Sequence, residues 1–160
     1  MSFRVLQHPT GMRCLVKHDG DQLQLVTDTM KILQETVPHS DPVVLLCAIG
    51  EPSTGKTGII NGIFNHLMSL TSSEKPNCGG FLQPKNNTQN GPEIDCVLAC
   101  TPAFVVQNVN SEQRVSILLL DVWNNAVTSE EVYLRLVDFC FQASCMRMFP
   151  LRGPARPVSA

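Results

Sequence analysis

The stretch that decides the fold reads Val43-Val-Leu-Leu-Cys-Ala-Ile-Gly50-Glu-Pro-Ser-Thr-Gly55-Lys56-Thr57. It joins a short apolar run, typical of a buried strand, to a complete G-x-x-x-x-G-K-[ST] pattern. A loop of this kind turns its backbone N–H groups toward a phosphate, and the helical pattern that follows places a helix N-terminus at the same anion. The stretch therefore predicts a phosphate-binding loop between a strand and a helix. The alternative is a turn of Gly, Pro, Ser and Thr that fits the pattern by chance.

The pattern assigns a role to each polar residue of the loop. Lys56 is the predicted catalytic cation, because it would reach the β- and γ-phosphates of a nucleotide. The Thr57 hydroxyl is predicted to bind Mg²⁺. The predicted nucleotide-binding residues run from the first glycine of the loop into the helix: Gly50, Glu51, Pro52, Ser53, Thr54, Gly55, Lys56, Thr57 and Gly58.

The rest of the chain alternates strand and helix patterns, which predicts an α/β fold. An Asp-Gly pair between two β-type runs predicts a hairpin. A helix that Thr27 or Asp28 could cap follows it and ends before Pro38. The predicted hairpin strands are 13–17 and 22–26, the later strands are 93–107 and 114–121, and the later helices are 56–70 and 129–145.

Two residues outside the loop complete a predicted phosphoryl-transfer site. Asp121 follows the apolar run Ile117–Leu120, where a carboxylate could hold Mg²⁺; its alternative is a simple strand-end cap. The polar stretch 71–92 is long enough to be a functional loop, and its Thr88 could close onto Mg²⁺ as a second catalytic and metal-binding residue. The alternative for Thr88 is an ordinary polar loop residue.

Composition bounds the function classes. The chain has 160 residues, 43% of them apolar, which suits one domain of moderate size. The net charge is −2 and basic and acidic residues are interspersed, so the sequence lacks the cluster of basic residues that binding to nucleic acid or an anionic membrane requires. No membrane span or secretory signal is visible, so a cytoplasmic protein is expected. The seven cysteines are predicted to be mainly reduced core thiols, with a metal site as the alternative.

These features together resemble the N-terminal half of the G domain of the atlastin and guanylate-binding-protein class of large, dynamin-superfamily GTPases. The similarity is carried by five segments: Cys14–Lys17, Leu25–Leu33, Val43–Leu67, Gly79–Phe81 with Asn87-Thr88, and Val115–Asp121. The resemblance implies a P-loop NTPase fold, a G-domain-like three-layer sandwich that stops after the switch II helix.

The resemblance also implies a division of the chain and a set of partners. Residues 1–12 would be a loose arm, 13–149 a partial G domain, and 150–160 an irregular Pro-rich tail. Within the domain it implies a P-loop at 50–57, a switch I-like loop at 71–92 and a switch II-like segment at 121–128. It implies GTP and Mg²⁺ as ligands, GTPase chemistry, a homodimer or heterodimer through the G domain, and a place in the cytoplasm or at the cytosolic face of membranes.

Three departures from the family pattern matter: two point to slow or impaired hydrolysis, and the third leaves the choice of base open. Ser53 occupies the position of the arginine that the family uses as a finger in cis, and such a finger supplies roughly 10³–10⁵ in rate. Asn124 replaces the glycine whose N–H meets the γ-phosphate. The base-reading Arg-Asp motif is absent, so an ATP-dependent enzyme stays open. A non-hydrolysing interaction module is the main alternative.

The short sheet is further expected to leave Ile117–Leu120 exposed.

Overall fold

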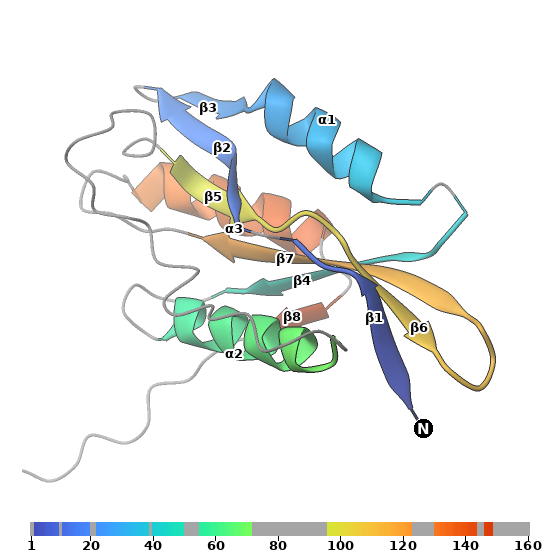
Figure 1. Ribbon diagram of the computed structural model, residues 1–160. Coiled ribbons are helices and arrows are strands. Elements are labelled where there is room, and N and C mark those ends of the chain that lie inside the picture. Colours follow the sequence, from blue (N-terminus) through green and yellow to red (C-terminus); the bar gives the residue numbers. More distant parts are fainter. Residues whose placement is uncertain are drawn as a thin grey trace, which may run out of the picture.

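The protein is an α/β domain in which three helices and one mixed sheet can be traced (Figure 1). The structure is a computed structural model that describes residues 2–9, 11–19, 22–38, 40–49, 55–71, 96–122, 130–143 and 146–148. The helices are α1 (Thr27–Thr36), α2 (Lys56–Ser69) and α3 (Glu130–Ala143). The strands are β1 (Phe3–Gln7), β2 (Arg13–Asp19), β3 (Gln22–Leu25), β4 (Val43–Ala48), β5 (Cys96–Cys100), β6 (Phe104–Asn108), β7 (Arg114–Val122) and β8 (Met146–Met148).

Strand β7 is the centre of the sheet. On one side it pairs in parallel with β4, and β8 pairs in parallel with the far edge of β4. On the other side it pairs antiparallel with β6 along its first half and with β5 along its second half. The sheet then branches, since β1 adds to β6, and the β2–β3 hairpin adds to β5.

Helices cover both faces of β4 and β7. Successive side chains of a strand point to opposite faces, and two separate cores result. Cys47, Leu118 and Leu120 belong to the core that packs with α1 and α3. Ala48 and Leu119 belong to the core that packs with the α2 side chains Ile60, Phe64, Leu67 and Met68. The described elements therefore form three layers.

The expectation that 117–120 would lie exposed is wrong. Ile117 is half-buried, and the next three residues are 0–3% exposed. They are covered because α2 lies on one face of β7 while α1 and α3 lie on the other. The helices that the sequence itself encodes are thus enough to bury the central strand.

Most predicted elements are confirmed, and three expectations need correction. The arm 1–12 is not loose throughout, since Phe3–Gln7 forms β1 by pairing with β6. The strand expected at 93–107 is broken after Cys100, because Pro102 cannot donate a ladder hydrogen bond. Thr27 and Asp28 lie inside α1, whose N-cap is Val26 without a side-chain cap. The tail 150–160 lies outside the described residues.

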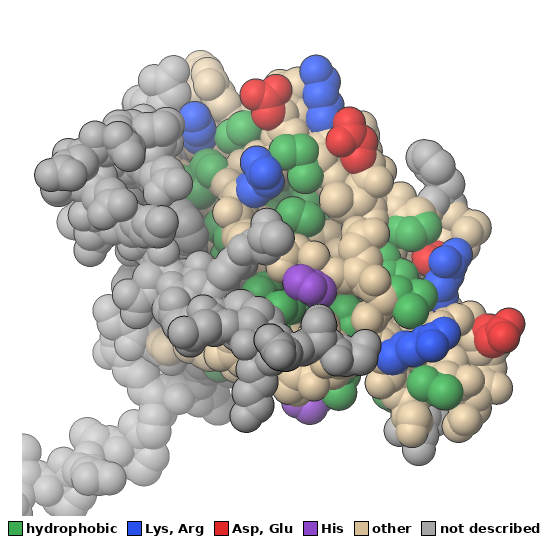
Figure 2. Space-filling view, viewed as in Figure 1, with side chains coloured by type: hydrophobic (Ala, Val, Ile, Leu, Met, Phe, Trp, Pro, Cys, Tyr) green, Lys and Arg blue, Asp and Glu red, His purple; other side chains and the backbone are tan. Residues whose placement is uncertain are grey.

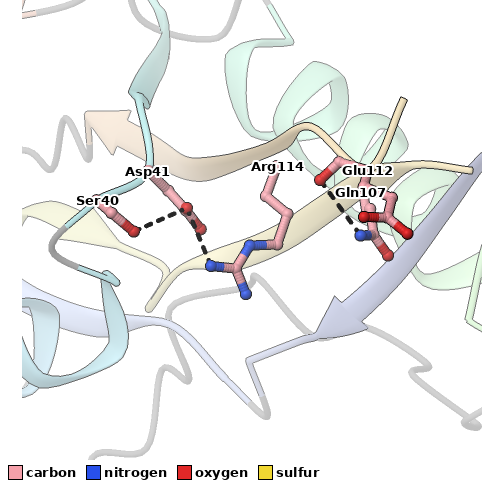
Figure 3. A network of polar contacts seen from close by, with 5 residues as sticks. All are labelled: Ser40, Asp41, Gln107, Glu112 and Arg114. Atoms are coloured by element: carbon pink, nitrogen blue, oxygen red, sulfur yellow. Dashed lines mark hydrogen bonds and ion pairs between the residues drawn. The ribbon is translucent and has the colours of Figure 1, made fainter. Parts of the chain in front are cut away.

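A polar network fixes the start of β4 against the start of β7 (Figure 3). Arg114 Nη2 lies 3.3 Å from Asp41 Oδ1, and the Ser40 hydroxyl donates to the same oxygen at 3.4 Å. The backbone N–H of Ser116 donates to the Pro42 carbonyl at 2.9 Å. These contacts fix the register between β4 and β7. Because the two strands are parallel, their C-terminal ends then lie side by side at the opposite edge of the sheet.

The cysteines among the described residues are all free thiols. Cys14 is half-buried, and Cys47, Cys96, Cys100 and Cys140 are buried, which confirms the predicted core position of these four. Burial raises the pKa of Cys100, and a hydrogen bond with Cys47, together with burial, raises the pKa of Cys140. Both thiols therefore stay protonated and inert at neutral pH.

Charges are spread over the surface, and the two signs are interspersed on the face seen in Figure 2. Within the described ranges, no helix has the length and apolar character that a membrane crossing requires. The same ranges hold no group of three His, Cys, Asp or Glu side chains placed to bind a metal ion.

Candidate functional site

The site lies where β4 and β7 end side by side. The two strands are parallel and stay in register from Val43 opposite Ser116 to Ala48 opposite Asp121. Because parallel strands carry their carboxyl ends to the same edge of a sheet, Asp121 lies next to the point where the predicted phosphate loop leaves β4. The Asp121 side chain is fully buried.

The turn into α2 is made at a glycine in the left-handed conformation. Gly55 has φ +88° and ψ 20°, in the left-handed region that glycine adopts at little cost. A Cβ added there would meet no atom within 4 Å, so the backbone conformation and not the available space calls for glycine.

Gly55 is also the N-cap of α2. Its carbonyl accepts the first helical hydrogen bond, from the Ile59 N–H, at 3.1 Å. The N–H groups of residues 56–58 precede this bond and have no acceptor within the helix. They lie at the positive end of the helix dipole, on the side from which the loop arrives, and this is a favourable place for an anion.

A hydrogen bond joins the helix to the strand end. Thr57 Oγ1, in the first turn of α2, donates to Asp121 Oδ2 at 2.8 Å. Thr57 is half-buried, while the carboxylate that accepts its hydrogen bond is fully enclosed. The sequence predicted both residues as Mg²⁺ ligands, and the structure brings them together from positions 64 residues apart.

The two oxygens suit a hard divalent cation. Carboxylate and hydroxyl oxygens are the ligand types that Mg²⁺ prefers, and adjacent ligands of an octahedral Mg²⁺ at about 2.0–2.1 Å lie roughly 2.9 Å apart. The observed 2.8 Å separation between Thr57 Oγ1 and Asp121 Oδ2 is the ordinary length of an O–H···O hydrogen bond, and it leaves the two oxygens close enough to share one ion. Mg²⁺ usually keeps several waters and takes further oxygens from phosphates, so one carboxylate and one hydroxyl are a sufficient protein contribution.

The topology makes the same edge of the sheet the expected place for a ligand. Helix α2, which follows β4, lies on one face of the sheet, and α3, which follows β7, lies on the other. The chain thus leaves two neighbouring parallel strands in opposite directions (Figure 1). In open α/β sheets, ligands bind outside the carboxyl ends of the strands at such a switch point.

Four predicted site residues are placed by the structure: Gly55, Thr57 and Gly58 at the start of α2, and Asp121 at the end of β7. The backbone of Lys56 opens α2, while its side chain is not described. The predicted residues Gly50, Glu51, Pro52, Ser53, Thr54 and Thr88, as well as Asn124, lie outside the described residues.

Ala48 is a site residue that the motif does not reveal. It is fully buried, pairs with Asp121 and belongs to the core beneath α2. A larger side chain there would press on the α2 side chains of the same core, such as Ile60 and Phe64. The sequence signal that could have indicated its role is that Ala48 is a small residue within the otherwise larger apolar run 43–49.

In comparisons with known proteins, no protein-family model matches the sequence, and no curated protein is significantly similar to it.

Proposed function

We propose that this chain binds GTP with Mg²⁺ through a P-loop of the G-domain type and hydrolyses it slowly. The observation that carries the proposal is the 2.8 Å contact of Thr57 with Asp121. It unites the last residue of the G-x-x-x-x-G-K-T pattern with the carboxylate that ends the neighbouring parallel strand, and these are the two protein groups that hold Mg²⁺ in P-loop NTPases.

Each residue then has a defined task. The N–H groups of the loop and of the first turn of α2 bind the phosphate oxygens, and the Lys56 ammonium adds a positive charge at the β- and γ-phosphates. Thr57 and Asp121 would supply the metal's protein oxygens. Thr88 of the stretch 71–92 would be a further ligand of the same metal. Bound Mg²⁺ would neutralise charge that develops on the phosphates during transfer.

Lys56→Ala tests the proposal directly. We expect it to weaken binding of a fluorescent GTP analogue about ten- to a hundredfold, because a charge-assisted hydrogen bond contributes about 1.5–3 kcal/mol. The measurement is a fluorescence titration in Mg²⁺ buffer with the full chain. Lys31→Ala is the matched control, since it removes the same charge from an exposed position on α1.

Equal affinity of the Lys56→Ala and wild-type proteins would sink the proposal, as would the absence of binding to a wild type that circular dichroism shows to be folded. Competition by unlabelled GTP and ATP in the same titration reads the base preference. The preference for guanine rests on the family resemblance, and stronger competition by ATP would replace GTP by ATP as the ligand.

Hydrolysis is expected to be slow because Ser53 replaces the family's arginine finger and Asn124 replaces the glycine at the γ-phosphate. We expect a turnover below about 10⁻² s⁻¹, the scale of a G protein that has its arginine in cis. A phosphate-release assay over hours measures it, with Lys56→Ala as the blank. Faster turnover would contradict the effect assigned to Ser53. Binding without any release favours the second candidate function, a non-hydrolysing G-domain module that acts by interaction.

A further inference from the structure

A cavity lies away from the strand ends where the nucleotide site is proposed. It has a volume of about 580 Å³ and opens where the chain passes from β1 to β2, beside the C-terminal half of α1 and the bend between β5 and β6. This volume is within the range of small-molecule sites. None of the residues of the proposed nucleotide site lines it.

Hydrogen bonds between three segments brace the cavity wall. Gln7 Nε2 donates to the Thr36 carbonyl at 3.1 Å and to the Ala103 carbonyl at 3.4 Å. The Ala103 N–H donates to Thr36 Oγ1 at 3.3 Å. These bonds join β1, the end of α1 and the β5–β6 bend, so the cavity is largely preformed.

The lining combines an apolar wall with positive charge. The apolar side chains are Pro9, Met12, Ile32, Pro102 and Ala103. Arg13 and His8 are the lining residues that can carry a positive charge, and no lining residue is acidic. Arg13 forms no ion pair within the described part of the chain, and Nδ1 of the His8 ring lies 3.3 Å from the Pro9 carbonyl oxygen.

We propose that this cavity binds a small monocarboxylate with an apolar body. The guanidinium of Arg13 is permanently charged and presents a planar fork of N–H donors, which matches a carboxylate in a bidentate geometry. The apolar wall takes the body of the molecule, and His8 offers a further hydrogen bond at the rim. A single permanent cation suits a monoanion better than the multiple charges of a nucleotide. This site is independent of the proposed GTP site.

Three probes of similar size test the charge requirement: 3-phenylpropanoate, its neutral amide and 3-phenylpropylamine. We expect 3-phenylpropanoate to bind at millimolar concentration, as befits a probe of this size. We expect the amide to bind about five- to tenfold more weakly and the amine not at all. Amide chemical shifts of the full-length chain, followed by two-dimensional NMR, should move at Gln7, Arg13, Ile32 and Ala103.

Arg13→Gln should weaken 3-phenylpropanoate about five- to tenfold and leave the amide unchanged. Its fold is expected to survive, since Arg13 is exposed and its strand pairs through backbone groups. Arg4→Gln, an equal charge change on exposed β1, is the matched control and should alter neither probe. Ile32→Phe should block both probes by filling the cavity. Equal affinities for acid and amide, an effect of Arg4→Gln as large as that of Arg13→Gln, or unchanged binding to a folded Ile32→Phe would each overturn the proposal.

Discussion

Asp121→Asn is expected to lower the affinity of the nucleotide complex for Mg²⁺ about a hundredfold while leaving the domain folded. Even a residue that only supports a metal ligand changes metal affinity by about 10–100-fold, so loss of the carboxylate itself should reach the upper end of that range. The fold should survive because Asn has the same shape, and its carbonyl can still accept the hydrogen bond that Thr57 donates.

The measurement is a Mg²⁺ titration of the wild type and the variant, each starting in chelator with a fluorescent GTP analogue. Asp28→Asn, an equal charge change on exposed α1, is the matched control and should leave the titration unchanged. If the folded Asp121→Asn variant responds to Mg²⁺ as the wild type does, the Asp121 carboxylate does not bind the metal and only accepts the hydrogen bond from Thr57.

A double-mutant cycle separates those two roles. If Thr57 and Asp121 bind one metal, Thr57→Val and Asp121→Asn should be strongly non-additive in Mg²⁺ affinity, because either change alone disrupts the shared site. If the pair is only a structural hydrogen bond, Thr57→Val should lower the free energy of unfolding, Asp121→Asn should lower it little because Asn keeps the acceptor, and neither change should alter the Mg²⁺ response.

The sequence predicted the parts of the fold that depend on local signals. The strand before Gly50 and the helix from Lys56 are encoded by the apolar run and the motif within 15 residues. Strand β1 escaped prediction because Phe3–Gln7 is a strand only through its pairing with β6, about 100 residues away. Pro102 is a local signal for the break between β5 and β6, and the prediction of one continuous strand over 93–107 did not take it into account.

The candidate site was predictable as a set of residues but not as a geometry. The phosphate-loop motif predicted Thr57 as a ligand of Mg²⁺. Asp121 was predicted because it follows an apolar strand. Their 2.8 Å contact requires the register between β4 and β7, which the polar contacts at the opposite edge fix and which no local pattern reveals. The cavity beside Arg13 was beyond prediction because three distant segments build it.

Phe104→Ala is expected to destabilise the domain by about 3–5 kcal/mol. Phe104 is fully buried and meets Phe64 of α2 edge-to-face, with ring centroids 5.3 Å apart and an interplanar angle of 69°. Removing the ring loses its burial, leaves a cavity and also removes an aromatic pair. Since domains are stable by only about 5–15 kcal/mol, a large share of the stability would be lost.

Chemical denaturation followed by circular dichroism measures the change. Phe139→Ala is the matched control: this ring, on α3, is 41% exposed and should cost no more than about 1 kcal/mol. A loss for Phe104→Ala no greater than that of Phe139→Ala would show that the Phe64–Phe104 contact does not hold α2 on the sheet.

The same variant links the core to the proposed ligand. The Phe64–Phe104 pair holds the helix whose first turn carries Thr57, so a looser α2 should bind nucleotide more weakly. A ligand that binds only the folded state still stabilises it, by about 2.7 kcal/mol at a concentration of 100 Kd. We therefore expect Mg²⁺ with a GTP analogue at saturation to recover part of the stability that Phe104→Ala loses, and to recover less when Lys56→Ala is added. Equal recovery in both backgrounds would mean that the nucleotide stabilises the domain at some place other than the N-terminus of α2.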